Sequence, residues 1–237
     1  MKPYYLLLVL FLVSCTTQQV NSTLGQLNKA AQEDQLTTND VIGGLKEALI
    51  QGISNGSDIA SQVDGYLGNP QIKIPFPPDV KKVEDKLRQI GLGNEVDKFI
   101  TSLNRGAEKA AKEAKPIFIS AIKSMTIDDA WGILKGEPNA ATEYLKRTTS
   151  DQLYEKFNPV IKSSLDEVNA TKYYGDIINT YNKIPFVEKV NPDLDDYATL
   201  QAMDGLFYLI EQEEAKIRKD PVARVTDLMK RVFAEQD

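Results

Sequence analysis

Two neighbouring glutamates near an arginine are the first residues of this chain that could do chemistry. Glu213 and Glu214 continue an apolar stripe by helical spacing, and Arg218 follows Glu214 by four residues. A glutamate four residues before an arginine is in the favourable order for an ion pair on a helix. A carboxylate on an apolar face must be paired or lie at its edge, and perturbed carboxylates are candidate acids and bases where a cleft accompanies them.

A second polar cluster, Asn104, Arg105 and Glu108, flanks a run of small residues on an earlier predicted helix. Small side chains let a neighbouring helix approach closely. If the two helices meet, we expect Arg105 to face Glu214 in a partly buried network. Two interpretations stay open for these clusters: a structural network, or a ligand-binding or catalytic site.

The composition excludes much other chemistry. With no histidine and one cysteine, the chain cannot form a Ser-His-Asp or Cys-His site, a histidine zinc site, a thiolate cluster or an internal disulfide. Asp193, Asp195 and Asp196 resemble the start of a calcium loop, but Ala198 and Asp204 stand where glycine and glutamate are needed. We therefore expect no metal and no cofactor.

Charge makes nucleic acid an unexpected partner. The formal net charge is −6, and the longest basic cluster is Lys81-Lys82. Such a chain lacks the basic stripe that neutralises a row of phosphates.

The single cysteine ends an N-terminal apolar run. Lys2 precedes the run from Tyr4 to Val13, which is half of the ~20 residues that span a bilayer. Leu12-Val13-Ser14-Cys15 resembles a bacterial lipobox, whose cysteine is lipidated and becomes the first residue of the mature chain. The alternatives are an ordinary signal peptide, or a buried helix with an incidental cysteine.

The lipobox interpretation divides the chain into three parts. Residues 1–14 are a cleaved lipoprotein signal peptide, residues 15–37 the lipidated N-terminus and polar tether, and residues 38–237 one helical domain. Acyl chains stabilise membrane attachment by ~0.8 kcal/mol per buried methylene, so two or more anchor a protein stably. No aspartate follows Cys15, which favours the outer membrane facing the periplasm.

The pattern of the domain is that of an all-α, multi-helix bundle. Helical spacing begins at Asn39 or Asp40 and is expected to be interrupted at Gly56. Residues 71–78 read as extended because they contain three prolines. Further helices are predicted over 79–90, 94–114, 126–134, 140–146, 172–181 and 193–219, with Pro116 breaking or kinking the chain between the second and third of these.

Some expectations concern single positions. Thr126 and Asp129 form a predicted capping box. Ser150 is expected to cap a separate helix, with Pro159 as a kink. Asp220-Pro221 is expected to begin the last helix, whose inward residues are Val222, Val225, Leu228, Met229, Val232 and Phe233. The tetrapeptide Lys-Ile-Pro-Phe occurs at 73–76 and 183–186, and both copies are expected to lie as apolar loops over the core.

The chain resembles a bacterial family of domains of unknown function, number 4197. The resemblance covers roughly residues 38–235. Its landmarks are Leu103-Asn104-Arg105-Gly106-Ala107-Glu108, Pro116-Ile117-Phe118, Met125-Thr126-Ile127-Asp128-Asp129-Ala130 and Glu213-Glu214-Ala215-Lys216-Ile217-Arg218. The resemblance implies an exported, mostly helical protein, often a lipoprotein, and supplies no catalytic residues to transfer.

Three functions are compatible with these observations. The first is a lipid-anchored, non-enzymatic envelope module that binds a partner protein, a lipid or a cell-wall ligand. The second is a carboxylate-dependent hydrolase of cell-wall material using Glu213, Glu214 or Glu108, and the third is a structural or assembly factor. Tyrosines of the second half, Tyr173 and Tyr174 among them, could stack on sugars or simply complete the core.

Overall fold

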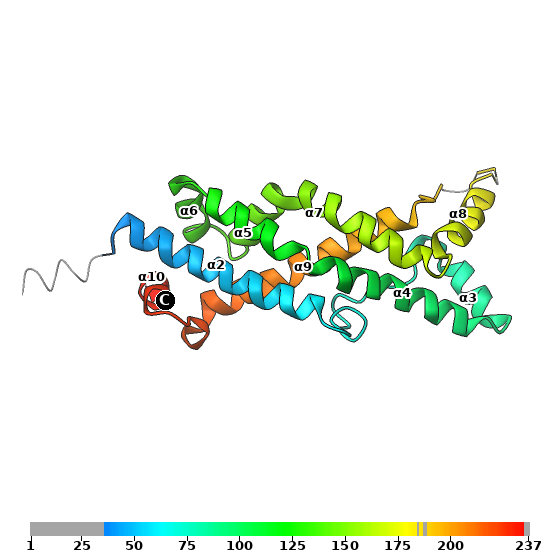
Figure 1. The fold of residues 1–237 in the computed structure, drawn as a ribbon, viewed down its shortest axis with the longest axis horizontal. Helices are drawn as coiled ribbons and strands as arrows, with labels where there is room; N and C mark the ends of the chain where they lie inside the picture. Colours follow the sequence, from blue (N-terminus) through cyan, green and yellow to red (C-terminus); the bar gives the residue numbers. More distant parts are fainter. Residues whose placement is uncertain (1–35, 184, 187–188, 235–237) are drawn as a thin grey trace, which may run out of the picture. The chain divides into compact units, whose positions relative to one another are not determined.

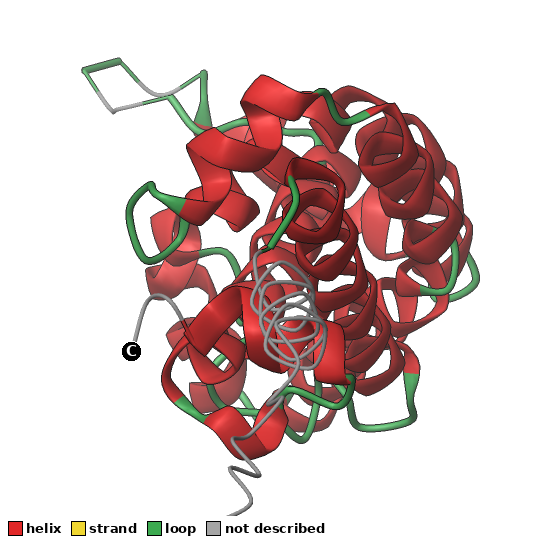
Figure 2. Ribbon diagram, turned by 90° about the vertical axis from the view of Figure 1, so that its left-hand side faces the viewer, coloured by secondary structure: helices red, strands yellow, loops and turns green. Residues whose placement is uncertain are grey.

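The computed structural model describes residues 36–183, 185–186 and 189–234. These residues form α-helices and two short 3-10 helices, with no strand among them (Figure 2). The all-α fold expected from the sequence is confirmed. The elements are α2 (Thr38–Ser61), η1 (Pro78–Val80), α3 (Lys81–Gln89), α4 (Gly93–Ala111), α5 (Ala114–Ser124), α6 (Ile127–Leu134), α7 (Ala140–Asp166), α8 (Ala170–Tyr181), α9 (Leu194–Lys219), η2 (Pro221–Ala223) and α10 (Asp227–Ala234).

The described residues from Thr38 onward form one compact unit by their contacts. The four long helices pack pairwise, α2 on α9, α4 on α7 and α7 on α9, with α3 and α8 at one end and α6 and α10 at the other (Figure 1). A unit with its own apolar core can be studied as an isolated domain. No helix in the described part of the chain is long and apolar enough to cross a membrane.

Glycines bring α2 close to its neighbours. A Cβ added at Gly56 would lie 3.2 Å from Cγ1 of Ile210 in α9, and one at Gly44 would lie 2.7 Å from Cγ2 of Val232 in α10. The expected interruption at Gly56 is therefore wrong: α2 continues through it to Ser61. Close packing on α9 offsets the ~1 kcal/mol by which glycine weakens a helix.

The small residues of α4 meet α7. Ala107, Ala110 and Ala111 are fully buried, and a Cβ at Gly106 would lie 3.3 Å from Cβ of Ser164. The close approach of a neighbouring helix at this run is confirmed. The helix that packs most extensively on α4 is α7, although α4 also contacts α9.

The predicted helix start at Ser150 is wrong, because α7 is continuous from Ala140 to Asp166 and runs through Pro159. Ser150 lies inside the helix, where its hydroxyl donates to the carbonyl of Lys146 at 2.7 Å. A serine inside a helix can satisfy its hydroxyl by donating to the carbonyl four residues before it. The capping box of Thr126 and Asp129 at the start of α6 is confirmed.

The C-terminal helix begins later than expected. Asp220 caps the 3-10 turn η2, and α10 starts only at Asp227. Val222 and Val225 point outward, with 88% and 68% of their surface exposed, so their assignment to the core is wrong. Met229, Val232 and Phe233 are buried as predicted.

The extended segment before α3 lies across the bundle. Ile72, Ile74 and Phe76 are buried, and a Cβ at Gly205 of α9 would meet Ile72 and Tyr66. The first Lys-Ile-Pro-Phe copy thus covers the core as expected. The second does not, because Phe186 is fully exposed, and Ile184 lies outside the described residues.

Candidate functional site

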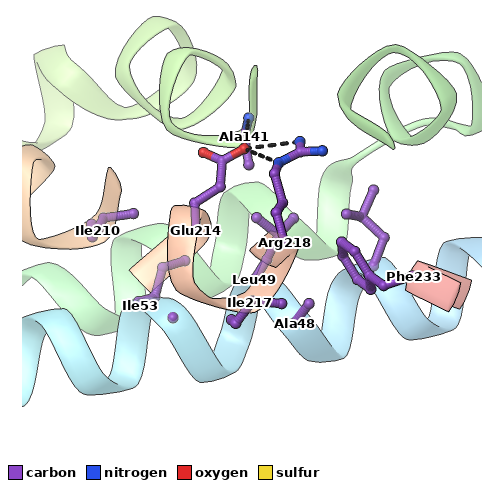
Figure 3. Close-up of a pocket in the computed structure, with 11 residues that line it drawn as sticks. Ala48, Leu49, Ile53, Ala141, Ile210, Glu214, Ile217, Arg218 and Phe233 are labelled. Carbon is purple, nitrogen blue, oxygen red and sulfur yellow. Dashed lines mark hydrogen bonds and ion pairs between the residues drawn. The ribbon is translucent and has the colours of Figure 1, made fainter. Parts of the chain in front are cut away.

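Glu214 caps the first turn of α7. Its carboxylate accepts a hydrogen bond from the backbone N–H of Ala141 at 3.0 Å (Figure 3). It also accepts from the backbone N–H of Thr142 at 2.9 Å and from the Thr142 hydroxyl at 2.8 Å. The first N–H groups of a helix have no partner within it, and its dipole favours negative charge there. This carboxylate therefore joins α9 to α7.

Arg218 completes the Glu214 network. Its Nε and Nη2 lie 3.0 and 2.9 Å from Oε1 of Glu214, and Nη2 also donates to the carbonyl of Ile133 at 2.8 Å. The predicted ion pair is confirmed. The partly open space beside it measures about 30 Å³, room for only a water molecule or two. This volume is far below the ~300–1,000 Å³ typical of small-molecule sites.

Glu108 and Arg105 form a separate network. The buried Glu108 carboxylate accepts from the backbone N–H groups of Tyr66 and Leu67, both at 3.2 Å, and from Nη1 of Arg105 at 2.6 Å. Nη2 of Arg105 pairs with Asp64 at 2.8 Å. The expectation that Arg105 faces Glu214 is wrong, because Arg105 holds the turn after α2 instead.

Asn104 fixes the extended segment. Its side chain accepts from the N–H of Ile74 and donates to the carbonyl of the same residue, both at 2.8 Å, and it donates to the carbonyl of Ile100 at 2.7 Å. Glu213 belongs to none of these groups, since it accepts from Asn55 at 2.6 Å and lies 3.6 Å from Lys216. The six polar residues singled out from the sequence thus occupy separate networks in the described structure, each satisfied by protein groups.

A different place in the fold has room for a ligand. At the end of the bundle that holds α3 and α8, an apolar cavity of about 440 Å³ lies between α3, α4, the α7–α8 turn and α8. This volume is within the range of ~300–1,000 Å³ typical of small-molecule sites. Its lining residues are Phe76, Leu87, Leu92, Glu95, Val96, Lys98, Phe99, Val168, Ala170, Tyr173 and Tyr174.

Aromatic and aliphatic side chains form most of the cavity wall. The rings of Phe76 and Phe99 pack with their centroids 4.9 Å apart, and Val96 is buried beside them. Leu92 and Val168 are exposed at its edge, so the cavity opens to solvent. Asn104 contributes indirectly, because it fixes Ile74 and thereby the position of Phe76 two residues on.

The charged residues of the cavity neutralise each other. Nζ of Lys98 lies 3.0 Å from Oε1 of Glu95, and both side chains are exposed. Deeper in the wall, burial and then the carboxylate of Asp79 raise the pKa of Tyr174 to about 12. The phenol is therefore neutral throughout the physiological range and can donate a hydrogen bond.

Sequence reasoning missed this cavity because its walls come from two regions far apart in the chain, residues 76–99 and 168–174. Two weak signals pointed toward it. Phe76 follows Ile72 and Ile74 in alternation, and the adjacent Tyr173 and Tyr174 were among the tyrosines considered for stacking. Neither signal shows that the two segments meet.

The family model of proteins of unknown function called DUF4197 matches residues 35–234. The chain belongs to the DUF4197 family. The family expected from the sequence is confirmed, and the match includes both the polar networks and the cavity. No curated protein and no solved structure matches this DUF4197 chain.

The described residues of this DUF4197 protein contain no group of three or more histidine, cysteine, aspartate or glutamate side chains placed to hold a metal ion. Cys15 and the predicted signal peptide lie outside the described residues. Lipidation at Cys15 stays a prediction from the sequence.

Proposed function

We propose that this DUF4197 protein is a non-enzymatic, lipid-anchored envelope protein whose helical domain binds an apolar ligand in the cavity between α3, α4 and α8. The observation that carries the proposal is the cavity itself: about 440 Å³, lined mainly by apolar and aromatic side chains and open at Leu92 and Val168. A structural spacer has no need of such a space, because apolar surface that stays open to water contributes nothing to the stability of the fold.

The state of the carboxylates supports binding over hydrolysis. A glycosidase-type mechanism needs two carboxyl groups about 5–9.5 Å apart across an open cleft, free to exchange protons with substrate. Glu214 and Glu108 are both buried and engaged by backbone N–H groups and an arginine. Glu213 is held by Asn55 and Lys216.

The location belongs to the same proposal. The lipobox-like Leu12-Val13-Ser14-Cys15 supports attachment of the mature chain through lipid on Cys15, and the residue after it supports the outer membrane facing the periplasm. A partner protein, a lipid or cell-wall material could each supply the apolar group, and nucleic acid is not among the partners proposed.

Binding of N-phenylnaphthylamine, an uncharged apolar dye, to the isolated domain tests the proposal. We expect saturable binding by the wild-type domain. Ala170 lines the cavity at the start of α8, and Ala170→Leu adds three carbons there. The substitution should weaken binding by about tenfold or more, which corresponds to ~1.4 kcal/mol.

The matched control is Gln212→Leu, which places a leucine on the exposed face of α9. It should bind the dye as the wild type does. Thermal unfolding verifies that each variant is folded. A folded Ala170→Leu domain with wild-type affinity, or a wild-type domain that does not bind the dye, would contradict the proposal.

A further inference from the structure

Tyr174 lines the cavity, and its hydroxyl makes no hydrogen bond to a described protein group. Its side chain is only 6% exposed. Among the described residues, the sealed side-chain atoms without a partner belong to Gln51, Ser57 and Thr171. The Tyr174 hydroxyl is therefore accessible and can donate a hydrogen bond to a ligand.

The other tyrosines show how unusual this is within the same domain. The hydroxyl of Tyr66 donates to the carbonyl of Ala202 at 2.6 Å, that of Tyr144 to Ala121 at 3.1 Å, and that of Tyr197 to Pro75 at 3.3 Å. Each of these residues donates to a backbone carbonyl of a neighbouring element. Tyr174 instead borders a space large enough for a ligand.

The charges nearby restrict what a ligand could offer to this hydroxyl. Burial first, and then the negative charge of Asp79, raise the pKa of the Tyr174 phenol. The same negative charge disfavours an anionic group on the ligand at this point. Lys98 is the cationic lining residue, and Glu95 already pairs with it at the exposed rim. A neutral acceptor therefore suits the site better than a carboxylate or a phosphate.

We propose that the ligand of this cavity is an uncharged molecule with an apolar chain and a carbonyl oxygen, as in an ester, amide or ketone, which accepts a hydrogen bond from the Tyr174 hydroxyl. This inference rests on the proposed function, since it assumes that the cavity binds an apolar ligand. It adds the chemical class of that ligand and the residue that selects it.

Two matched probes separate the hydrogen bond from burial of the chain. Methyl nonyl ketone carries the carbonyl, and its hydrocarbon isostere has a methylene in place of the oxygen. Each displaces N-phenylnaphthylamine from the wild-type domain and from Tyr174→Phe. Because each probe is compared with itself on the two proteins, the free energy of transferring it out of water cancels.

Tyr174→Phe should weaken binding of the ketone by roughly 2- to 12-fold, which is the effect of one hydrogen bond. It should change the affinity for the hydrocarbon isostere by less than about twofold. The control is Tyr173→Phe, which lines the same cavity but is 62% exposed, and it should leave both probes unchanged. Undecanoate, which has the same number of carbons as the ketone and a negative charge, should bind the wild type more weakly than the ketone.

The outcomes distinguish the two proposals. If both probes bind and Tyr174→Phe weakens them equally, the hydrogen-bond inference is overturned while binding in the cavity stands. If undecanoate binds as tightly as the ketone, the requirement for a neutral ligand is overturned. If neither probe nor dye binds the wild type, the proposed function itself fails.

Discussion

The carboxylate of Glu214, in the last third of α9, lies 2.9 Å from the backbone nitrogen of Thr142 and 2.8 Å from its hydroxyl, in the first turn of α7. This contact joins the first turn of α7 to the side of α9, and these are the two longest helices of the domain. It also uses the residue that, from the sequence, looked most like a catalytic acid. The position of Glu214 on an apolar face is explained by the helix end that it caps.

Glu214→Ala should lower the free energy of unfolding by about 3–5 kcal/mol, because it removes the carboxylate that pairs with Arg218 and leaves two helix N–H groups and the Arg218 Nε without an acceptor. Urea denaturation of the isolated domain measures this. The control is Asp227→Ala, which breaks the exposed pair with Lys230 and should cost less than about 1 kcal/mol. Equal losses in the two variants would show that the Glu214 network does not stabilise the fold.

Gly205→Ala should destabilise the domain although alanine is the better helix former. The added Cβ would lie 2.8 Å from Cε1 of Tyr66 and 3.1 Å from Cβ of Ile72, both buried. Overpacking of this kind costs about 1–3 kcal/mol. Gly132→Ala in α6 is the matched control, since nothing lies within 4 Å of its Cβ, and it should stabilise by up to ~1 kcal/mol. The same sign of change in both variants would contradict the packing at Gly205.

The features that could be predicted from the sequence are those that depend on a local pattern of residues. The stripe of Met203, Leu206, Phe207 and Ile210 is buried as helical periodicity requires, and the pair of Glu214 with Arg218 follows from their spacing. Both properties are set within a few turns of one helix.

Properties set by distant contacts were not predictable. Helix α2 continues through Gly56, because Ile210 of α9, which is distant in sequence, packs closely against this glycine. Arg105 pairs with Glu108 and Asp64 because α4 packs on α7 through its small residues, and helix periodicity does not specify which helices meet. The cavity is of this kind too, since Phe76, Phe99 and Tyr174 converge only in the folded chain.

Alkaline stability should depend on Tyr174. Its folded-state pKa is raised from 10.0 to about 12, by burial first and Asp79 second. The unfolded chain therefore loses this proton at a lower pH than the folded chain. Stability from this group is complete below pH 10 and is lost as the pH rises toward 12.

Urea denaturation across this pH window checks the sign. The free energy of unfolding should fall with pH less steeply in Tyr174→Phe than in the wild type. Below pH 10 the two proteins should differ by a constant amount. Identical slopes between pH 10 and 12 would show that Tyr174 is not buried as described.

Cys15→Ser should abolish lipid attachment, because serine cannot carry the thioether-linked diacylglyceryl group. We expect an uncleaved or soluble precursor in the variant and a processed, membrane-bound wild type. Metabolic labelling with palmitate and fractionation of the envelope measure both. A variant that still matures and stays membrane-bound would show that the lipobox interpretation is wrong.

Native mass spectrometry of the mature protein, purified from its own envelope, tests the central claim most directly. The account predicts a bound neutral, apolar molecule on the wild type that is absent from a folded Ala170→Leu variant, because leucine enters the cavity that Ala170 lines. An adduct retained at the same level in Ala170→Leu, or a wild-type protein that carries none, would contradict binding at this site.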